Sequence, residues 1–191
     1  MLELLADTDT TLFLFLNGFH SPFWDDVMWF VSGKMQWIPL YLAIISWMIY
    51  KFRWKAVYII ISVIILIALT DQLAVKLFKE TVLRLRPCHQ PELSRLVHLV
   101  NNHCGGKYGF ISNHAANSFA LATFTAFIFR NRIFTMFIFF WAAVVAYSRV
   151  YLGVHFPGDI IAGAMFGMLV AVLVFIALKT INNRFKLGLS G

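Results

Sequence analysis

Charged residues are scarce in this chain, at 13% of its 191 residues, while hydrophobic residues make up 60% and the mean hydropathy is +0.76. This balance is too apolar for an ordinary soluble domain, in which about a quarter of the residues are charged. Charges are absent from five successive stretches, at 35–50, 56–70, 108–129, 133–148 and 160–178. A bilayer-spanning helix needs roughly 20 apolar residues, which two stretches reach outright and three reach with flanking residues. The sequence therefore predicts an all-α fold, a polytopic membrane helical bundle with five clear spans.

The N-terminus lacks a basic leading region, and Asp7, Asp9 and Asn17 interrupt its apolar stretch, so a cleavable signal peptide is not expected. Its aromatic residues sit among polar ones, which is typical of helices in the headgroup layer. A sixth span over 11–24 stays open, because that stretch carries no formal charge. The length fits one domain. We expect a single membrane-embedded domain, 1–191, with N-terminal interfacial helices at 1–34, a helical bundle with site-bearing loops at 35–181 and a tail at 182–191.

Acidic residues are few, at 9 against 16 lysines and arginines. In a membrane protein, an excess of basic residues is first interpreted through the side of the membrane on which each one lies. Nucleic acid is therefore not an expected partner. Alternating the five spans divides the basic residues evenly between the two faces. One face has its basic residues at 51–55, 130–132 and 179–186. It is interpreted as cytoplasmic, because the basic residues of the other face cluster around the candidate site and have a second reason to be there. The small size and short loops favour a bacterial inner membrane, with the candidate site facing the periplasm or exterior; the oligomeric state stays open.

Only two cysteines are present, Cys88 and Cys104, and both lie in the 87–107 connection on the outer face. Two cysteines that close one loop in an oxidising compartment indicate a disulfide. Two free thiols are the alternative. A metal site that includes the neighbouring histidines is a further one, although their spacing matches no standard zinc pattern.

Polar residues gather in three segments at the outer ends of the predicted spans. The segments are Lys79–Pro87, Ile111–His114 and Ser148–Asp159. Because they share one face under the alternating topology, they can converge although they are far apart in sequence.

The residue types in these segments suit phosphate chemistry. Lys79, Arg86 and Arg149 supply cations, and a guanidinium pairs with phosphate oxygens in a bidentate way. Asp159 follows His155 by four residues, so its carboxylate can orient one ring nitrogen and leave the other free to attack. Ser112 adds a hydroxyl at the start of a helix, where free backbone N–H groups favour an anion, and His114 can protonate a leaving oxygen. Arg84, Arg95 and Lys107 are interpreted as headgroup contacts or topology determinants.

The spacing Lys79-x6-Arg86-Pro87, Ser112-x-His114 and Ser148-Arg149-x5-His155-x3-Asp159 resembles the three-part signature of the type 2 phosphatidic acid phosphatase family. Bacterial lipid phosphatases, glucose-6-phosphatase and the vanadium haloperoxidases share that signature. The resemblance implies a six-helix fold and a membrane lipid phosphatase that forms a phosphohistidine. It assigns the nucleophile to His155, its orienting carboxylate to Asp159 and the general acid to His114. Phosphate would be held by Lys79, Arg86, Ser112, Arg149 and the backbone N–H of Asn113. No metal or other cofactor is expected.

The middle segment departs from the usual Pro-Ser-Gly-His of that family. Ile111 replaces the proline and Asn113 replaces the glycine. Asparagine tolerates a left-handed backbone better than most residues. We therefore expect Asn113 to keep the turn, with its side chain within reach of the phosphate.

Three other functions compete with the phosphatase. A vanadate-dependent peroxidase is disfavoured by the predicted spans, and a non-catalytic lipid-phosphate binding or flipping protein would need only the cations. A transporter or channel is disfavoured because the charges lie at the ends of the predicted spans. The position of the polar segments at the membrane surface favours a phosphorylated lipid as the substrate partner. Phospholipids, polyprenyl diphosphates and lipid A all stay open.

Overall fold

Long helices follow directly from the uncharged stretches, and the turns between them contain most of the charged residues. The computed structural model describes residues 2–188, which form helices and irregular loops without a β-strand. The α-helices are α1 (Leu2–Asn17), α2 (Pro22–Ser32), α3 (Ile38–Phe52), α4 (Ala56–Ala74), α5 (Glu80–Val82), α6 (Asn113–Phe129), α7 (Arg132–Tyr151) and α8 (Pro157–Phe185). Single turns of other helix types are η1 (Met35–Trp37), η2 (Arg53–Lys55), η3 (Val75–Lys79), η4 (Pro87–His89) and η5 (Val100–Asn102).

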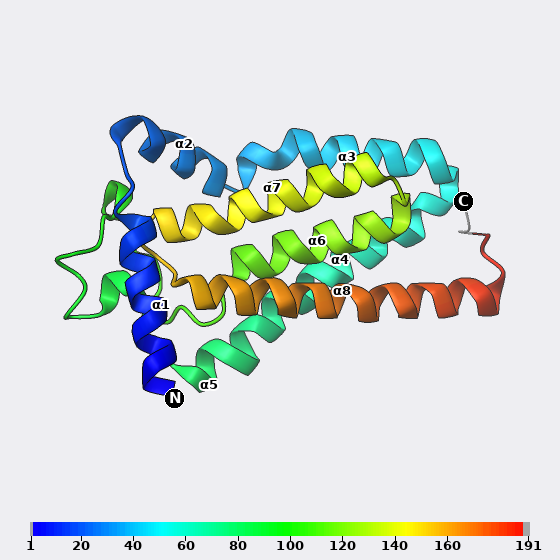
Figure 1. Ribbon diagram of the computed structural model, residues 1–191. Helices are drawn as coiled ribbons and strands as arrows, with labels where there is room; N and C mark the ends of the chain where they lie inside the picture. Colours follow the sequence, from blue (N-terminus) through cyan, green and yellow to red (C-terminus); the bar gives the residue numbers. More distant parts are fainter. Residues whose placement is uncertain (1, 189–191) are drawn as a thin grey trace.

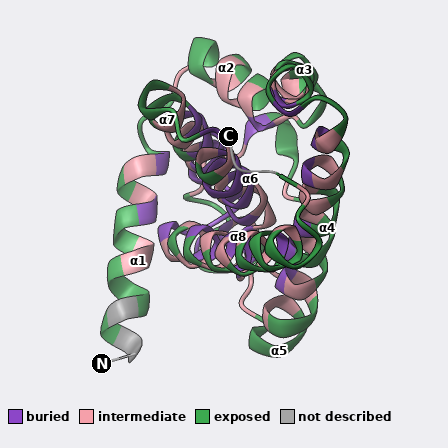
Figure 2. Cartoon of the chain, turned by 90° about the vertical axis from the view of Figure 1, so that its right-hand side faces the viewer, coloured by how far each residue is buried: buried purple, intermediate pink, exposed green. Residues whose placement is uncertain are grey.

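The bundle consists of α3, α4, α6, α7 and α8; α3, α6, α7 and α8 run in similar directions, and α4 passes obliquely along them (Figure 1). In the end-on view α6 lies in the middle, and its buried surface is enclosed by α4, α7 and α8 (Figure 2). Small residues allow this central position. A Cβ at Gly163 of α8 would lie 2.7 Å from the Ser112 carbonyl oxygen, so glycine is what lets α8 approach the start of α6.

The outer faces of the bundle carry exposed leucine, isoleucine and phenylalanine, as expected of helices in lipid. Within residues 2–188, three stretches are long and apolar enough to cross a membrane: Met35–Val82, Arg132–Tyr151 and Pro157–Phe185. The first reverses direction at Arg53 and so contains both α3 and α4 (Figure 1). The all-helical membrane fold is confirmed in this coarser form. The central α6, with 17 residues, is not among these stretches, so the prediction of five spans stays a prediction.

The N-terminal region does not join the bundle as a parallel helix. Helix α1 crosses the end of the bundle at a steep angle (Figure 1). It ends at Asn17, and the next helix begins only at Pro22. Residues 11–24 therefore do not form the single helix that a sixth span would need. The buried Asn17 amide fastens α1 by donating to the carbonyls of Val150 and Tyr151, at 3.2 and 2.8 Å. Helix α8 ends at Phe185, so the predicted tail begins within it, and 189–191 of that tail lie outside the described residues.

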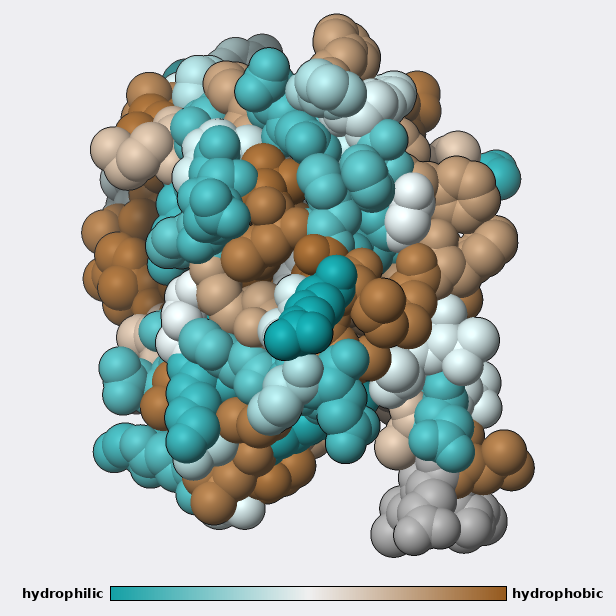
Figure 3. Space-filling model, turned by 90° about the vertical axis from the view of Figure 1, so that its left-hand side faces the viewer, coloured by the Kyte–Doolittle hydropathy of each residue, from teal (hydrophilic) through white to brown (hydrophobic). Residues whose placement is uncertain are grey.

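The same end of the bundle carries the irregular segment between α5 and α6. Cys88 and Cys104 form a disulfide within it, with their Cα atoms 5.9 Å apart. Hydrophilic side chains gather on this end face, interspersed with hydrophobic ones (Figure 3). The loops and α1 thus form a polar cap over one end of an apolar bundle.

Candidate active site

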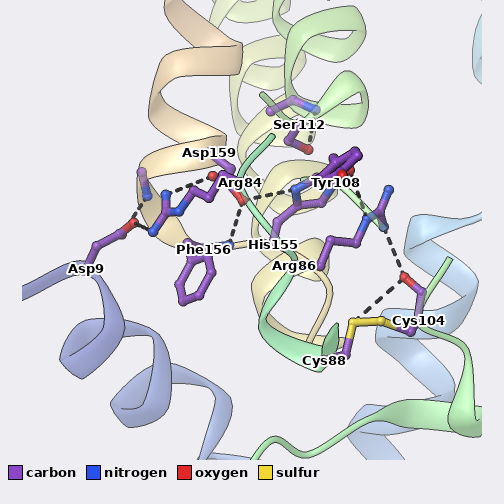
Figure 4. A network of polar contacts seen from close by, with 12 residues as sticks. Asp9, Arg84, Arg86, Cys88, Cys104, Tyr108, Ser112, His155, Phe156 and Asp159 are labelled. Carbon is purple, nitrogen blue, oxygen red and sulfur yellow. Dashed lines mark hydrogen bonds and ion pairs between the residues drawn. A yellow bond between two sulfur atoms is a disulfide. The ribbon is translucent and has the colours of Figure 1, made fainter. Parts of the chain in front are cut away.

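The turn from α7 into α8 places the predicted histidine–carboxylate pair. Helix α7 ends at Tyr151, and Gly153 takes a φ of +77°, a left-handed conformation that favours glycine. The backbone N–H of His155 then donates to the Arg149 carbonyl at 3.2 Å. Asp159 lies in the first turn of α8, and its Oδ2 lies 3.3 Å from Nδ1 of His155 (Figure 4). Because a carboxylate only accepts, Nδ1 carries the proton and Nε2 keeps its lone pair.

The start of α6 is fixed against the same turn. The backbone N–H of Ser112 donates to the Asp159 carbonyl at 3.0 Å. The Ser112 side chain is fully buried and caps α6 by accepting from the N–H of Ala115 at 3.5 Å. The predicted phosphate ligand Ser112 thus contacts its own helix. His114 follows in the first helical turn.

Asn113 differs from the sequence-based expectation. It is the first residue of α6 and is not among the described residues with positive φ, so the predicted left-handed turn at Asn113 is wrong. The N-cap Ser112 makes the turn with φ −73° and ψ 113°, a conformation that requires no glycine at the next position. The Asn113 amide instead donates to Oδ1 of Asp71 in α4, at 2.8 Å.

The segment Lys79–Pro87 supplies two cations, Lys79 and Arg86, to the surroundings of His155. Lys79 ends the π-helical turn η3, and the chain then passes through a left-handed Leu83. Arg86 is 9% exposed, and its Nη1 donates to the carbonyl of Cys104 at 3.1 Å. The disulfide-closed loop therefore holds this guanidinium in place (Figure 4).

These residues meet at one end of a cavity of about 580 Å³. The polar lining at that end includes Lys79, Arg86, Asn113, His114, Arg149 and His155, together with Ser32 and Lys34. Arg149 also donates to the hydroxyl of Ser32 in α2, while its buried Nε has no hydrogen-bond partner among the described residues. The cavity continues between α3, α4, α6 and α7 with an apolar lining. Ser112 and Asp159 are buried and do not line the cavity themselves.

Burial and the neighbouring positive charges together determine the protonation state of His155. The side chain is 2% exposed. Burial, followed by the positive charges of Arg86, Arg149 and Lys79, holds the pKa of His155 well below its usual value of 6.5. The imidazole is therefore neutral at physiological pH, which is the state that a nucleophile requires.

Sequence reasoning missed the residues that hold Asp159 from behind. Arg84, interpreted above as a headgroup contact or topology determinant, donates from Nη1 to Oδ1 of Asp159 at 2.9 Å and from Nη2 to Oδ2 of Asp9 at 2.6 Å (Figure 4). Asp9 in turn accepts from the Gly158 N–H at 2.7 Å. No local pattern marks this contact, since Arg84 lies 75 residues from each partner.

Comparison with known proteins agrees with this architecture. Residues 54–183 match the PAP2 superfamily. The lipid A 4'-phosphatase of Bacteroides thetaiotaomicron is 45% identical over 170 residues, which cover 87% of this chain and 75% of that protein. The lipid A 4'-phosphatase of Porphyromonas gingivalis is 39% identical over 175 residues, which cover 91% and 74%.

Two crystal structures share the fold. The PAP2-type phosphatidylglycerolphosphate phosphatase of Bacillus subtilis has a TM-score of 0.68 at 22% identity, covering 94% of this chain and 87% of that one. LpxE of Aquifex aeolicus has a TM-score of 0.62 at 23% identity, covering 86% and 93%.

The fold and these relatives define an integral membrane lipid phosphatase, a hydrolase of phosphoric monoesters. The chain belongs to the PAP2 superfamily, the type 2 phosphatidic acid phosphatase family that its three motifs resemble.

Proposed function

We propose that this protein hydrolyses a phosphate monoester of a membrane lipid through a phosphohistidine on His155, with a lipid A phosphate as the foremost substrate. The observation that carries the mechanism is the buried pair of His155 and Asp159, 3.3 Å apart, at the cationic end of the cavity. The names of the two relatives, at 45% and 39% identity, support the substrate.

The phosphate would be held by Lys79, Arg86 and Arg149, three of the four cationic residues that line the cavity; Lys34 is the fourth. The unpartnered Nε of Arg149 gives this guanidinium a free donor. The backbone N–H of Asn113, at the first position of α6, has no acceptor within its own helix and adds another donor. Ser112 contributes by capping the helix that presents this N–H.

These positions support the following reaction. The lone pair on Nε2 of neutral His155 attacks phosphorus, the bond from phosphorus to the lipid oxygen breaks, and His114 donates a proton to that oxygen. Asp159 stabilises the positive charge that develops on the imidazole. Water then attacks the phosphorus, His114 takes one of its protons, and the P–N bond breaks to release phosphate and neutral His155.

The negative charge that develops on the phosphoryl oxygens is met by fixed cations. We therefore propose that the enzyme works without a metal ion. Activity that is unchanged in EDTA is expected, whereas activity lost in EDTA and restored by Mg²⁺ or Zn²⁺ would contradict this part of the proposal.

For the membrane, we propose five crossings by α3, α4, α6, α7 and α8, with α1 and α2 in the headgroup layer. Figure 1 supports this placement, because α3, α6, α7 and α8 run in similar directions with α4 passing obliquely along them, whereas α1 lies steeply across their end. The apolar part of the cavity, which includes Ile44, Ile67 and Val145, would receive acyl chains. The disulfide supports an oxidising compartment, which in a bacterial inner membrane is the periplasmic side.

A phosphate-release screen tests the function. The purified protein is assayed in detergent with lipid A, phosphatidate, phosphatidylglycerol phosphate and undecaprenyl diphosphate. We expect release from lipid A, abolished in His155→Ala and retained in His103→Ala, a control at an exposed histidine outside the cavity. Tight binding of lipid A without release by the wild type would instead indicate the non-catalytic lipid-binding protein.

A further inference from the structure

Asp71 is the one acidic residue among those that line the large cavity. It lies near the end of α4, within the apolar stretch Met35–Val82. No lysine or arginine nitrogen lies within 4.0 Å of its carboxylate among residues 2–188, although Lys34 and Lys79 attract it electrostatically. An ionisable residue in an apolar span is costly, and it usually has a functional reason.

Two asparagines of α6 hold one oxygen of this carboxylate. Asn113 Nδ2 donates to Oδ1 of Asp71 at 2.8 Å, and Asn117 Nδ2 donates to the same atom at 3.2 Å. The two asparagines are four residues apart and thus share one face of the helix. Both line the cavity together with Asp71. The second carboxylate oxygen, Oδ2, has no hydrogen-bond partner among residues 2–188.

This arrangement also explains the departure of Asn113 from the glycine that is usual in the family motif. A glycine there would remove the shorter of the two hydrogen bonds that fix Asp71. The side chain of Asn113 points to α4 and serves the carboxylate, whereas its backbone stays at the phosphate end.

Helical spacing orders the cavity into three zones. His114 lies at the start of α6, Asn117 follows about one turn later, and Leu121 follows after another turn, each turn advancing about 5.4 Å. On α4, Asp71 is likewise followed inward by Ile67 and Val63. All of these side chains line the cavity. Asp71 thus separates the catalytic end from the apolar end.

A lipid bound with its phosphate at His155 and its acyl chains in the apolar zone would place its headgroup beside Asp71. A carboxylate accepts hydrogen bonds and repels anions, so it favours a headgroup with hydroxyl or N–H donors near the scissile phosphate. Sugar phosphates have such donors. Phosphatidate has no free hydroxyl between its phosphate and its acyl chains.

We propose that Asp71, positioned by Asn113 and Asn117, is a headgroup-recognition residue that selects lipids whose phosphate is carried by a sugar. This inference rests on the proposed lipid phosphatase function and assigns the residue that selects its substrate class. Oδ2 of Asp71 accepts a hydrogen bond from a sugar hydroxyl or amide N–H next to the phosphate.

The test compares kcat/KM for a glucosamine-based lipid phosphate and for phosphatidate in the same detergent micelles. Asp71→Asn keeps the shape of the side chain but puts an NH₂ group in place of an acceptor. We expect kcat/KM for the sugar lipid to fall about 10- to 100-fold, as for loss of a hydrogen bond to a charged group. Phosphatidate hydrolysis should stay within about twofold. Asn117→Ala, which removes one of the two amides, should shift the ratio in the same direction by less.

Glu80→Gln is the matched control, because it removes the same charge from an exposed residue outside the large cavity. The ratio of the two substrates does not depend on the folded fraction, so a poorly folded variant still gives an answer. Equal losses on both substrates, or no loss on either, would overturn the inference while leaving the phosphatase function intact. Absence of turnover of any lipid by the wild type would overturn the proposed function and this inference with it.

Discussion

Arg84 and Asp159 form an ion pair, 2.9 Å long, on the side of the carboxylate that faces away from His155. Oδ1 of Asp159 accepts from Arg84, while Oδ2 accepts from the Phe156 N–H at 3.0 Å and lies beside Nδ1 of His155. Both oxygens of a fully buried carboxylate are therefore engaged. Arg84 also binds Asp9, so one guanidinium connects α1 to the turn that carries His155 and Asp159.

Removing this guanidinium should loosen the orientation of Asp159. For Arg84→Gln we expect kcat to fall about 10-fold or more with little change in KM, because a charge-assisted hydrogen bond behind the catalytic pair is lost. Arg84→Lys should recover part of the loss. Steady-state kinetics of phosphate release measure both. Arg95→Gln, at an exposed arginine of the same loop region, is the control. An Arg84→Gln enzyme with wild-type kcat would show that Arg84 has no positioning role.

Gly109 leaves space beside the catalytic pair. A Cβ at this position would lie 3.1 Å from Oδ2 of Asp159 and 3.5 Å from Nδ1 of His155, closer to the oxygen than ordinary packing allows. We expect Gly109→Ala to displace the carboxylate and lower kcat about 10-fold. A Cβ at Gly106 would have no atom within 4 Å, so Gly106→Ala is the matched control and should keep wild-type kcat. Equal kcat in the two variants would contradict the proposed geometry.

The low pKa of His155 predicts that the acidic limb of the pH profile of kcat/KM lies below pH 6.5. Because burial and the charges of Arg86, Arg149 and Lys79 lower this pKa, His155 stays neutral as the pH falls through 6.5. Protonation of the nucleophile then reduces kcat/KM only at lower pH. Lys79→Gln removes one of these charges, which raises the pKa of His155 and moves the acidic limb to higher pH.

Both enzymes are measured with the same substrate, so ionisation of the substrate phosphate affects both pH profiles equally and does not contribute to the difference between them. A limb that does not move between wild type and Lys79→Gln would show that another group governs it.

The proximity of His155 and Asp159 could be predicted from the sequence, because the necessary information is local. His155 and Asp159 are four residues apart at the boundary of an uncharged stretch, so helix geometry alone brings them together. The all-helical bundle could be predicted for a similar reason, because the scarcity of charge marks the long helices.

The supports of the site could not be predicted, because they join distant segments. Asp9 reaches Arg84 only because α1 crosses the end of the bundle, and no spacing in the sequence encodes that direction. Asp71 follows an uncharged stretch and looks like its boundary until α6 places two asparagines against it. The expectation for Asn113 was wrong because a serine N-cap made the turn that glycine was assumed to require.

The central claim is that the phosphoryl group is transferred to His155 before it is released, and a rapid-quench measurement tests this most directly. The enzyme is mixed with ³²P-labelled lipid substrate, quenched in alkali within milliseconds, digested and mapped by mass spectrometry. We predict an acid-labile, alkali-stable phosphate on the peptide containing His155 that forms and decays at rates consistent with turnover, and none in His155→Ala. Normal phosphate release by His155→Ala, or label on a different residue, would contradict this mechanism.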